Sequence, residues 1–333
     1  MIVDDSAFVR KVLRELLSQS PEIEVVGIAR DGLDALEKVY ELKPDVLTLD
    51  LIMPNLDGLG VLEGLPLEAA PRVIVVSISG TDTELGAAAL QAGALDIVRK
   101  PTALATDQLY ELRDELIRKV KQAAVARPRR FTRALQTPAV TPLSHTHEVI
   151  VLGTSTGGPQ AITRLLAALP GSLPVPIVIA LHIPSGYTEA LAARLDAGSA
   201  LDVREAEDGM QLRPGLAVLA RGGAHARIVR RDGRHCIAVD EHQGSATHAP
   251  SVNVLFESAA GTFGSGTLGV VLTGMGDDGL LGAGAIHRAG GLVLTEAEHS
   301  CVVYGMPRCV AEAGYSASQV SLDEMATEIL RFL

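Results

Sequence analysis

The stretch VIVLGTSTG, residues 149–157, joins an apolar run to a glycine-rich turn, and apolar residues at helical spacing follow from Gln160 to Leu169. This order predicts a strand, a sharp turn and a helix. Glycines permit the tight turn, and the N–H groups at a helix start favour a developing anion. The turn places Ser155 where a nucleophile, a capped helix start or a phosphate cradle could stand, and alone it does not decide among them.

Short apolar runs alternate with helical patterns on both sides of this turn. The predicted strands are residues 25–29, 46–49, 73–76, 95–98, 148–153, 175–181, 268–272 and 292–295, with a hairpin at 225–239. Such alternation predicts an α/β protein with two doubly wound, mostly parallel sheets. In these sheets functional groups gather at the carboxyl ends of the strands.

Length and composition divide the chain into two globular parts. At 333 residues the chain is long for one core. From Ala126 the composition shifts to Pro, Thr, Arg and Ser without a clear period, and we assign residues 119–146 to a linker. The domains are then expected at residues 1–118 and 147–333.

Several features of the composition exclude classes of protein. The net charge of −11 argues against a nucleic-acid partner. The three cysteines lack C-x-x-C spacing, which fits a reducing compartment and no zinc site. No apolar run reaches the roughly 18 to 20 residues that span a bilayer, and no signal peptide is evident. We therefore expect a cytoplasmic monomer without membrane insertion.

Polar residues end four predicted strands of the first part. Asp4 and Asp5 follow the first apolar run, Asp50 ends another, and Ser77 and Lys100 end two more. Three carboxylates at one edge repel each other unless a cation joins them, and oxygen ligands suit Mg²⁺. A hydroxyl and an ammonium beside them suit a phosphoryl group on Asp50. The plainer interpretation, that each acid caps a helix or solvates a loop, fits single acids better than all five groups.

The first part resembles the receiver domain of two-component response regulators over about residues 1–118. The matching pieces are VDDS at 3–6, LDLIMP at 49–54, Asp57-Gly58 and Lys100-Pro101. The resemblance implies a five-stranded parallel, flavodoxin-like sheet.

The same resemblance implies roles for the polar residues. Asp50 would accept phosphate from a histidine kinase, with Asp4 and Asp5 helping it to hold Mg²⁺. Ser77 and Lys100 would sense the phosphoryl group. Three residues precede Asp4, fewer than receivers usually have. A shortened central strand would weaken the sheet and loosen Asp4 and Asp5.

A serine at the turn of residues 153–157 needs a base and a group that orients the base. His182 ends the apolar run 175–181 and should project near Ser155, although a lone histidine is more often structural. Asp277 and Asp278 lie in another strand-end turn, where one can orient the histidine and the other can cap the next helix. The order Ser, His, Asp disfavours the α/β-hydrolases, which run Ser, Asp/Glu, His.

The second part resembles the methylesterase domain of chemotaxis regulators over about residues 147–333. The matching pieces are GTSTGGP at 153–159, LHIP at 181–184, HAPSV at 248–252, LTGMGDDG at 272–279 and VYGMPR at 303–308. The resemblance implies a mostly parallel, Rossmann-like domain carrying the β-hairpin, with no cofactor for the esterase reaction.

This second resemblance also assigns site residues. It implies that Ser155 is the nucleophile, His182 the base and Asp278 the acid, with Asp277 structural. The backbone at Met275, supported by Thr156, would belong to the oxyanion arrangement. Asn253 stands where the family commonly has Asp, a difference interpreted as peripheral.

A receiver, a linker and this domain, in that order, resemble CheB-type methylesterases. The resemblance implies a phosphorylation-activated hydrolase that demethylates glutamate methyl esters on chemoreceptors, releases methanol and deamidates receptor glutamines during chemotaxis adaptation. Three alternatives remain at this point. They are a phosphorylation-controlled binding module, a transcriptional regulator and a generic serine esterase.

Overall fold

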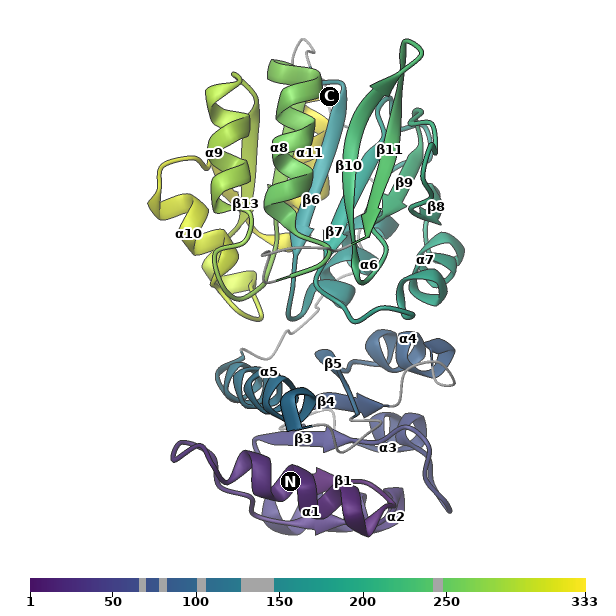
Figure 1. Cartoon of the computed structure of the whole chain (residues 1–333), viewed down its shortest axis with the longest axis vertical. Coiled ribbons are helices and arrows are strands. Elements are labelled where there is room, and N and C mark those ends of the chain that lie inside the picture. Colours follow the sequence, from purple (N-terminus) through teal and green to yellow (C-terminus); the bar gives the residue numbers. More distant parts are fainter. Residues whose placement is uncertain (66–69, 78–82, 101–105, 127–146, 242–247) are drawn as a thin grey trace. The chain divides into compact units, whose positions relative to one another are not determined.

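The computed structural model of the chain separates into two compact units, Met1–Ala126 and Arg127–Leu333 (Figure 1). The structure describes residues 1–65, 70–77, 83–100, 106–126, 147–241 and 248–333. Within these residues no helix is both long enough and apolar enough to cross a bilayer.

The first unit contains a five-stranded parallel sheet in the order β2-β1-β3-β4-β5, as the resemblance to receivers implied, and five helices among its described residues. The strands are β1 (Ile2–Val3), β2 (Ile28–Ala29), β3 (Val46–Leu49), β4 (Arg72–Ser77) and β5 (Asp96–Arg99). The helices are α1 (Ala7–Leu17), α2 (Gly32–Leu42), α3 (Gly58–Gly64), α4 (Thr83–Gln91) and α5 (Thr106–Val125).

Strand β1 is short but pairs on both sides. Ile2 and Val3 are in register with β2 and with β3, and the N–H of Asp50 donates to the carbonyl of Val3. Strand β2 is shorter than the predicted run 25–29 because its partner β1 has only two residues to pair with.

Helix α5 runs past residue 118, where we ended the first domain, and stops where the composition changes at Ala126. It ends at Val125, so residues 119–125, which we assigned to the linker, are helical. Lys119 anchors this turn, because its buried ammonium lies 2.7 Å from Asp96 Oδ1 and 2.6 Å from the carbonyl of Ile97. Residues 127–146 of the expected linker lie outside the described part.

The second unit contains a seven-stranded parallel sheet in the order β14-β13-β12-β6-β7-β9-β8 and a separate two-stranded hairpin. The strands are β6 (Val149–Thr154), β7 (Ile177–Leu181), β8 (Asp202–Glu205), β9 (Leu216–Leu219), β10 (Ala224–Arg231), β11 (Arg234–Glu241), β12 (Thr267–Val271), β13 (Leu292–Glu296) and β14 (Ser318–Val320). The helices are α6 (Gly158–Ala168), α7 (Thr188–Ala197), α8 (Val252–Phe263), α9 (Leu280–Arg288), α10 (Met306–Glu312) and α11 (Leu322–Arg331).

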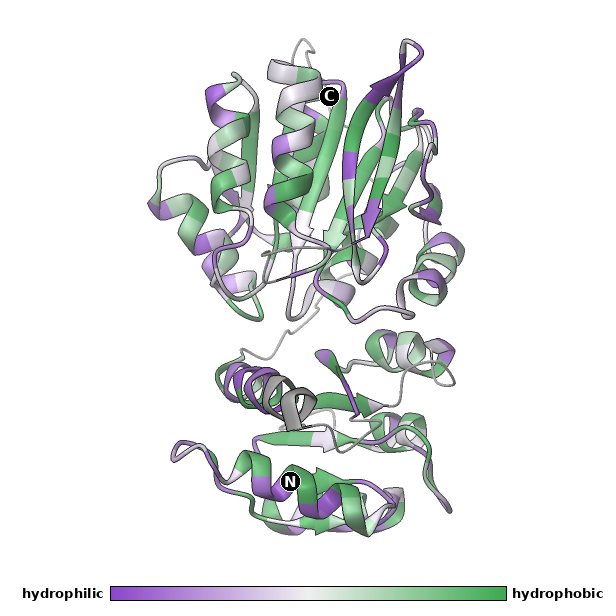
Figure 2. Ribbon diagram, viewed as in Figure 1, coloured by the Kyte–Doolittle hydropathy of each residue, from purple (hydrophilic) through white to green (hydrophobic). Residues whose placement is uncertain are grey.

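The central strands β6, β7 and β12 of this sheet are mostly apolar and are buried along their whole length. Figure 1 shows α8 and α9 on one face of the sheet and α11 behind it, and Figure 2 shows β6 as a nearly continuous hydrophobic strand. Parallel strands buried on both faces have this pattern. The hairpin packs on α8, where the Ser258 and Thr262 hydroxyls bond to the backbone N–H and C=O of Ile228. Its tip is hydrophilic (Figure 2).

Candidate functional sites

Ser155 lies in the turn between β6 and α6. The turn closes through the N–H of Gly158, which donates to the carbonyl of Ser155 at 2.7 Å. Gly157 has φ +78°, a left-handed conformation that favours glycine. Ser155 is only 5% exposed, so its surroundings, rather than bulk water, determine how its hydroxyl reacts.

His182 and Ser155 follow neighbouring strands at the same position. Leu181 pairs with Thr154, and the N–H of His182 donates to the carbonyl of Thr154. His182 Nε2 lies 2.8 Å from Asp278 Oδ2, across 96 residues of sequence. No hydrogen bond joins the two described residues Ser155 and His182, and such catalytic contacts often tighten only when substrate binds. His182 Nδ1 is the ring nitrogen that this geometry leaves for the serine.

Asp278 is held by several donors besides His182. The Ser251 hydroxyl donates to its carboxylate at 2.9 Å, and the N–H groups of Val252 and Asn253 donate at 2.8 and 2.9 Å. These N–H groups form the start of α8, where a helix favours negative charge. Burial alone would raise the pKa of Asp278, but the bonds from His182 and from the start of α8 lower it to about 2. Asp278 is therefore an ionised partner for the histidine.

A second histidine stacks on His182, which the sequence did not lead us to expect. The ring of His248 lies 4.2 Å from that of His182 with an interplanar angle of 22°. The sequence signal was limited to the piece HAPSV, in which Ser251 directly precedes an apolar helical pattern as N-cap residues do.

The expected helix cap at Asp277 is wrong. The start of α9 is capped by Asn253, whose Oδ1 accepts from the N–H groups of Gly279 and Gly282 at 3.0 and 2.8 Å. The backbone turns so that Gly279 occupies the N-cap position, two residues beyond Asp277. An acceptor oxygen is what position 253 requires, and asparagine supplies one.

Gly274, the residue before Met275, packs against Ser155. A Cβ on Gly274 would stand 2.9 Å from the Cβ of Ser155, so only glycine lets this turn approach so closely. The next residue, Met275, is exposed. In the described part of the chain its backbone N–H has no acceptor, whereas that of Gly274 donates to Val303. Thr156 is buried directly after Ser155.

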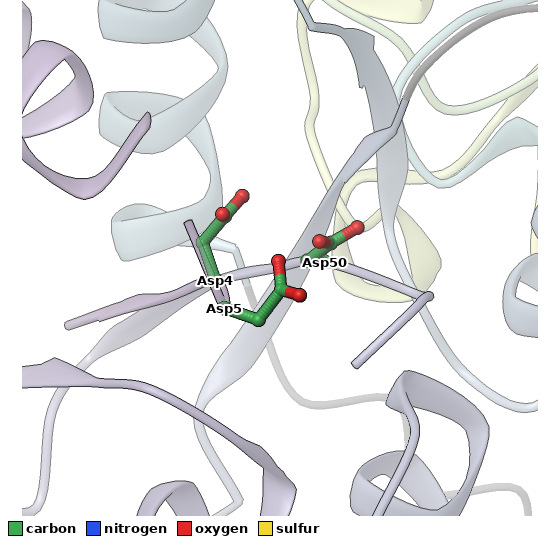
Figure 3. Close-up of side chains that lie close together, drawn as sticks. All are labelled: Asp4, Asp5 and Asp50. Carbon is green, nitrogen blue, oxygen red and sulfur yellow. The ribbon is translucent and has the colours of Figure 1, made fainter. Parts of the chain in front are cut away.

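The first unit brings Asp4, Asp5 and Asp50 together, as the sequence predicted (Figure 3). One carboxylate oxygen of each lies within 4.8 Å of those of the others. Asp4 and Asp50 are buried, and Asp5 is exposed. Asp4 stays fixed although β1 is short, because its N–H donates to the carbonyl of Ala29 and its carboxylate accepts from the N–H of Ser6.

Lys100 bridges the two buried acids. Its ammonium lies 2.8 Å from Asp4 Oδ2 and 2.6 Å from Asp50 Oδ2. Burial raises the pKa of Asp50, and neighbouring Asp4 adds to that effect, against the opposing pull of Lys100. Ser77 is buried at the end of β4, and its carbonyl accepts from the N–H of Lys100.

The acid cluster fits a magnesium ion on chemical grounds. Mg²⁺ takes oxygen ligands at about 2.0 to 2.1 Å, and three carboxylates converge here. The single Lys100 ammonium is shared between Asp4 and Asp50, so a divalent cation would relieve the remaining repulsion.

Two family models match the chain. The model described as CheB methylesterase matches residues 150–329, and the response regulator receiver domain matches residues 1–112. These matches agree with the fold and do not support the transcriptional-regulator or simple binding-module alternatives.

Individual relatives match over almost the whole chain. Protein-glutamate methylesterase/protein-glutamine glutaminase 5 of Myxococcus xanthus is 57% identical over 99% of this chain and 97% of its own length. A protein-glutamate methylesterase/protein-glutamine glutaminase of Thermotoga maritima is 40% identical over 95% of this chain and 93% of its own. The crystal structure of the Thermotoga maritima CheB methylesterase catalytic domain has a TM-score of 0.55 at 36% identity and covers 56% of this chain and 99% of that domain. The chain therefore belongs to the CheB methylesterase family, whose catalytic domain it joins to a response regulator receiver domain.

Proposed function

We propose that this enzyme demethylates glutamate methyl esters on the cytoplasmic helices of chemoreceptors and that phosphorylation of Asp50 activates it. The observation that carries the proposal is the hydrogen bond between His182 and Asp278 at the strand edge where Ser155 stands. Family membership supports the reaction class and its place in chemotaxis adaptation.

The reaction begins at the serine hydroxyl. His182 Nδ1 takes the proton from Ser155 Oγ as the oxygen attacks the ester carbonyl, while Asp278 stabilises the imidazolium that forms. The tetrahedral intermediate then collapses. His182 returns the proton to the leaving methoxide, and methanol departs from an acyl-enzyme on Ser155.

Water completes the cycle. It loses a proton to His182 as it attacks the acyl carbon, and the second tetrahedral intermediate then breaks its bond to Ser155 Oγ. His182 returns the proton to that oxygen, which releases the glutamate side chain and regenerates the serine. A glutamine side chain presents the same acyl carbon with ammonia as the leaving group, so we propose deamidation as the second activity.

The turn at residues 274–276 supplies the oxyanion donor in this proposal. The N–H of Met275 has no acceptor among the described residues and directly follows Gly274, which packs against Ser155, and the buried Thr156 is proposed to support the site. A preorganised donor of this kind contributes about 3 to 4 kcal/mol to transition-state stabilisation in acyl-transfer enzymes.

Control comes from the receiver in this proposal. Asp50 accepts the phosphoryl group from a histidine kinase, and Lys100 and Ser77 bind its oxygens. Asp4, Asp5 and Asp50 would hold Mg²⁺, which supplies charge neutralisation for phosphoryl transfer. The support is the close approach of Lys100 to Asp50 and the match to the receiver model.

Methanol release from methylated receptor membranes tests the enzymatic part. We expect the full chain to release methanol, and ammonia from receptor glutamines, and we expect Ser155→Ala to lose at least about 10⁴-fold in rate. Ser185→Ala, a serine in the neighbouring strand-end loop, serves as the control. A Ser155→Ala variant that keeps a rate within tenfold of wild type would rule out the serine mechanism.

A further inference from the structure

Thr273 lies two residues beyond the end of β12 and contacts the serine turn through three hydrogen bonds, made by its carbonyl and its hydroxyl. Its carbonyl accepts two bonds, from Thr154 Oγ1 at 2.6 Å and from the N–H of Ser155 at 3.1 Å. Its hydroxyl donates to the carbonyl of Thr156 at 3.1 Å. One residue therefore holds the nucleophile and both of its chain neighbours.

The same hydroxyl joins a third segment to the turn. It accepts from the N–H of Val303 at 2.9 Å, and the next residue, Gly274, donates its N–H to the carbonyl of Val303. Gly274 is in turn packed against Ser155 with no space for a side chain. The position of the Met275 N–H relative to the serine thus depends on Thr273.

A buried acid holds the third group of Thr273, its N–H. Glu296 ends β13 with no exposed surface, and its Oε2 accepts from the N–H of Thr273 at 2.8 Å. Its Oε1 accepts from the Ser300 hydroxyl at 3.0 Å, and that hydroxyl accepts from the N–H of Leu322 at the start of α11. Hydrogen bonds through Glu296 and Ser300 therefore connect Thr273 to β13 and to the start of α11.

We propose that Thr273 is a positioning residue, which sets Ser155 and the Met275 N–H in register, and that Glu296 holds Thr273 in place. The inference rests on the proposed hydrolase function and deepens it. A buried threonine that served stability alone would change the folding free energy when lost and leave the chemical step intact. A positioning residue affects the chemical step, because a shift of about 1 Å at a reacting group costs about 100-fold in rate.

The test compares Thr273→Val with Thr267→Val in the full chain with a phosphodonor. Thr267 is the matched control, since it is equally buried, starts the strand β12 that precedes Thr273, and donates its hydroxyl to the carbonyl of Ala259, far along the chain from the serine turn. We expect Thr273→Val to lower kcat for methyl-ester hydrolysis by about 10- to 100-fold with KM within about twofold of wild type. Thr267→Val should lower only the melting temperature.

Conservative replacements show whether a loss of kcat comes from the missing hydrogen-bonding group or from the changed size of the side chain. Thr273→Ser keeps the hydroxyl and should restore kcat to within about threefold of wild type. Glu296→Gln keeps an acceptor for the Thr273 N–H and should act likewise, whereas Glu296→Leu should reproduce the loss in Thr273→Val. If Thr273→Val does not fold, Thr273→Ala removes the same hydroxyl without adding bulk and is expected to show the same fall in kcat.

Three outcomes would overturn the proposal. A Thr273→Val or Thr273→Ala kcat within twofold of wild type excludes a positioning role. If Thr267→Val loses as much kcat as Thr273→Val, the loss is a general effect of replacing a buried threonine by valine. An inactive wild type refutes the hydrolase function and this inference together, whereas an active wild type with an active Thr273→Val refutes the positioning role alone.

Discussion

Asp50 and Asp278 are both largely buried carboxylates beyond the carboxyl ends of parallel strands, yet their pKa values move in opposite directions. Burial raises the pKa of Asp50, and nearby Asp4 reinforces this, with Lys100 as the main opposing charge. Burial acts on Asp278 in the same sense, but His182 and two backbone N–H groups overcome it and lower its pKa to about 2. Both carboxylates are buried, so the larger number of hydrogen-bond donors at Asp278 explains why the two pKa values shift in opposite directions.

The difference fits the two proposed chemistries. A carboxylate that accepts a phosphoryl group needs an oxygen that is not already saturated by donors, and Asp50 shares one ammonium with Asp4. A carboxylate that orients a histidine must remain ionised and motionless, and Asp278 receives four hydrogen bonds. In the proposed mechanism, aspartate therefore serves as a phosphoryl acceptor in one unit and as a fixed, unreactive partner of histidine in the other.

Among the variants that test this comparison of the two carboxylates, Asp278→Asn should have the largest effect. Asparagine keeps the shape but supplies neither the negative charge nor a second acceptor oxygen, so the imidazolium of His182 loses its partner. We expect kcat to fall by about 10³- to 10⁴-fold in the methanol assay. Asp277→Asn, the exposed neighbour, is the matched control and should stay within about twofold. Equal effects of the two changes would refute the assignment of Asp278.

The two sites should also respond oppositely to pH. The pKa of Asp278 is lowered, so its ionised form adds about 2 kcal/mol of stability that is present above about pH 5 and lost as pH falls toward 2. The pKa of Asp50 is raised, so its ionised form opposes folding at neutral pH, and that cost disappears in acid.

Two variants in the full chain make this contrast measurable. At pH 6 we expect Asp278→Asn to destabilise the second unit and Asp50→Asn to stabilise the first, with both differences shrinking by pH 3. Hydrogen exchange in a urea series, read from peptides of β6 and β3, reports each unit separately. Changes of the same sign in the two units would contradict the comparison.

Ser251→Ala should have the smallest effect of the variants in this comparison. It removes one of the four bonds to Asp278 and the cap on α8, where the Ser251 hydroxyl accepts from the N–H of Val254. We expect about 1 to 2 kcal/mol of destabilisation and a loss of kcat of about tenfold or less. A kcat loss as large as that of Asp278→Asn would show that the hydroxyl has a chemical role of its own.

The sequence predicted most strands and helices that are marked by a run or a period of apolar residues. Apolar runs that form buried strands, such as 46–49, were found almost residue for residue. Strands β8 and β14 were missed because they lie at the sheet edges and are polar, with sequences DVRE and SQV. Strand β9, with the sequence LAVL, was also missed, although it is buried and apolar. The predicted run 175–181 begins too early, because Pro176 has no N–H to donate and β7 starts after it.

The residues of the candidate sites also fall into those that the sequence predicted and those that it did not. The strand-end rule and the family motifs brought Ser155, His182 and the Asp4 cluster to the expected edges. Contacts between distant segments were out of reach, as with the stacking of His248 on His182 and the bond from Thr273 to Glu296. Such contacts depend on side-chain packing in three dimensions, which periodicity and spacing do not encode.

The most direct test of the whole account is the rate of methanol release from methylated receptor membranes, with and without a small phosphodonor and Mg²⁺, for wild type and Asp50→Asn. We predict that the phosphodonor raises the wild-type rate several-fold, and that Asp50→Asn keeps the unstimulated rate and does not respond. A phosphodonor response that persists in Asp50→Asn, or a wild-type rate that ignores the phosphodonor, would contradict control of Ser155 by Asp50.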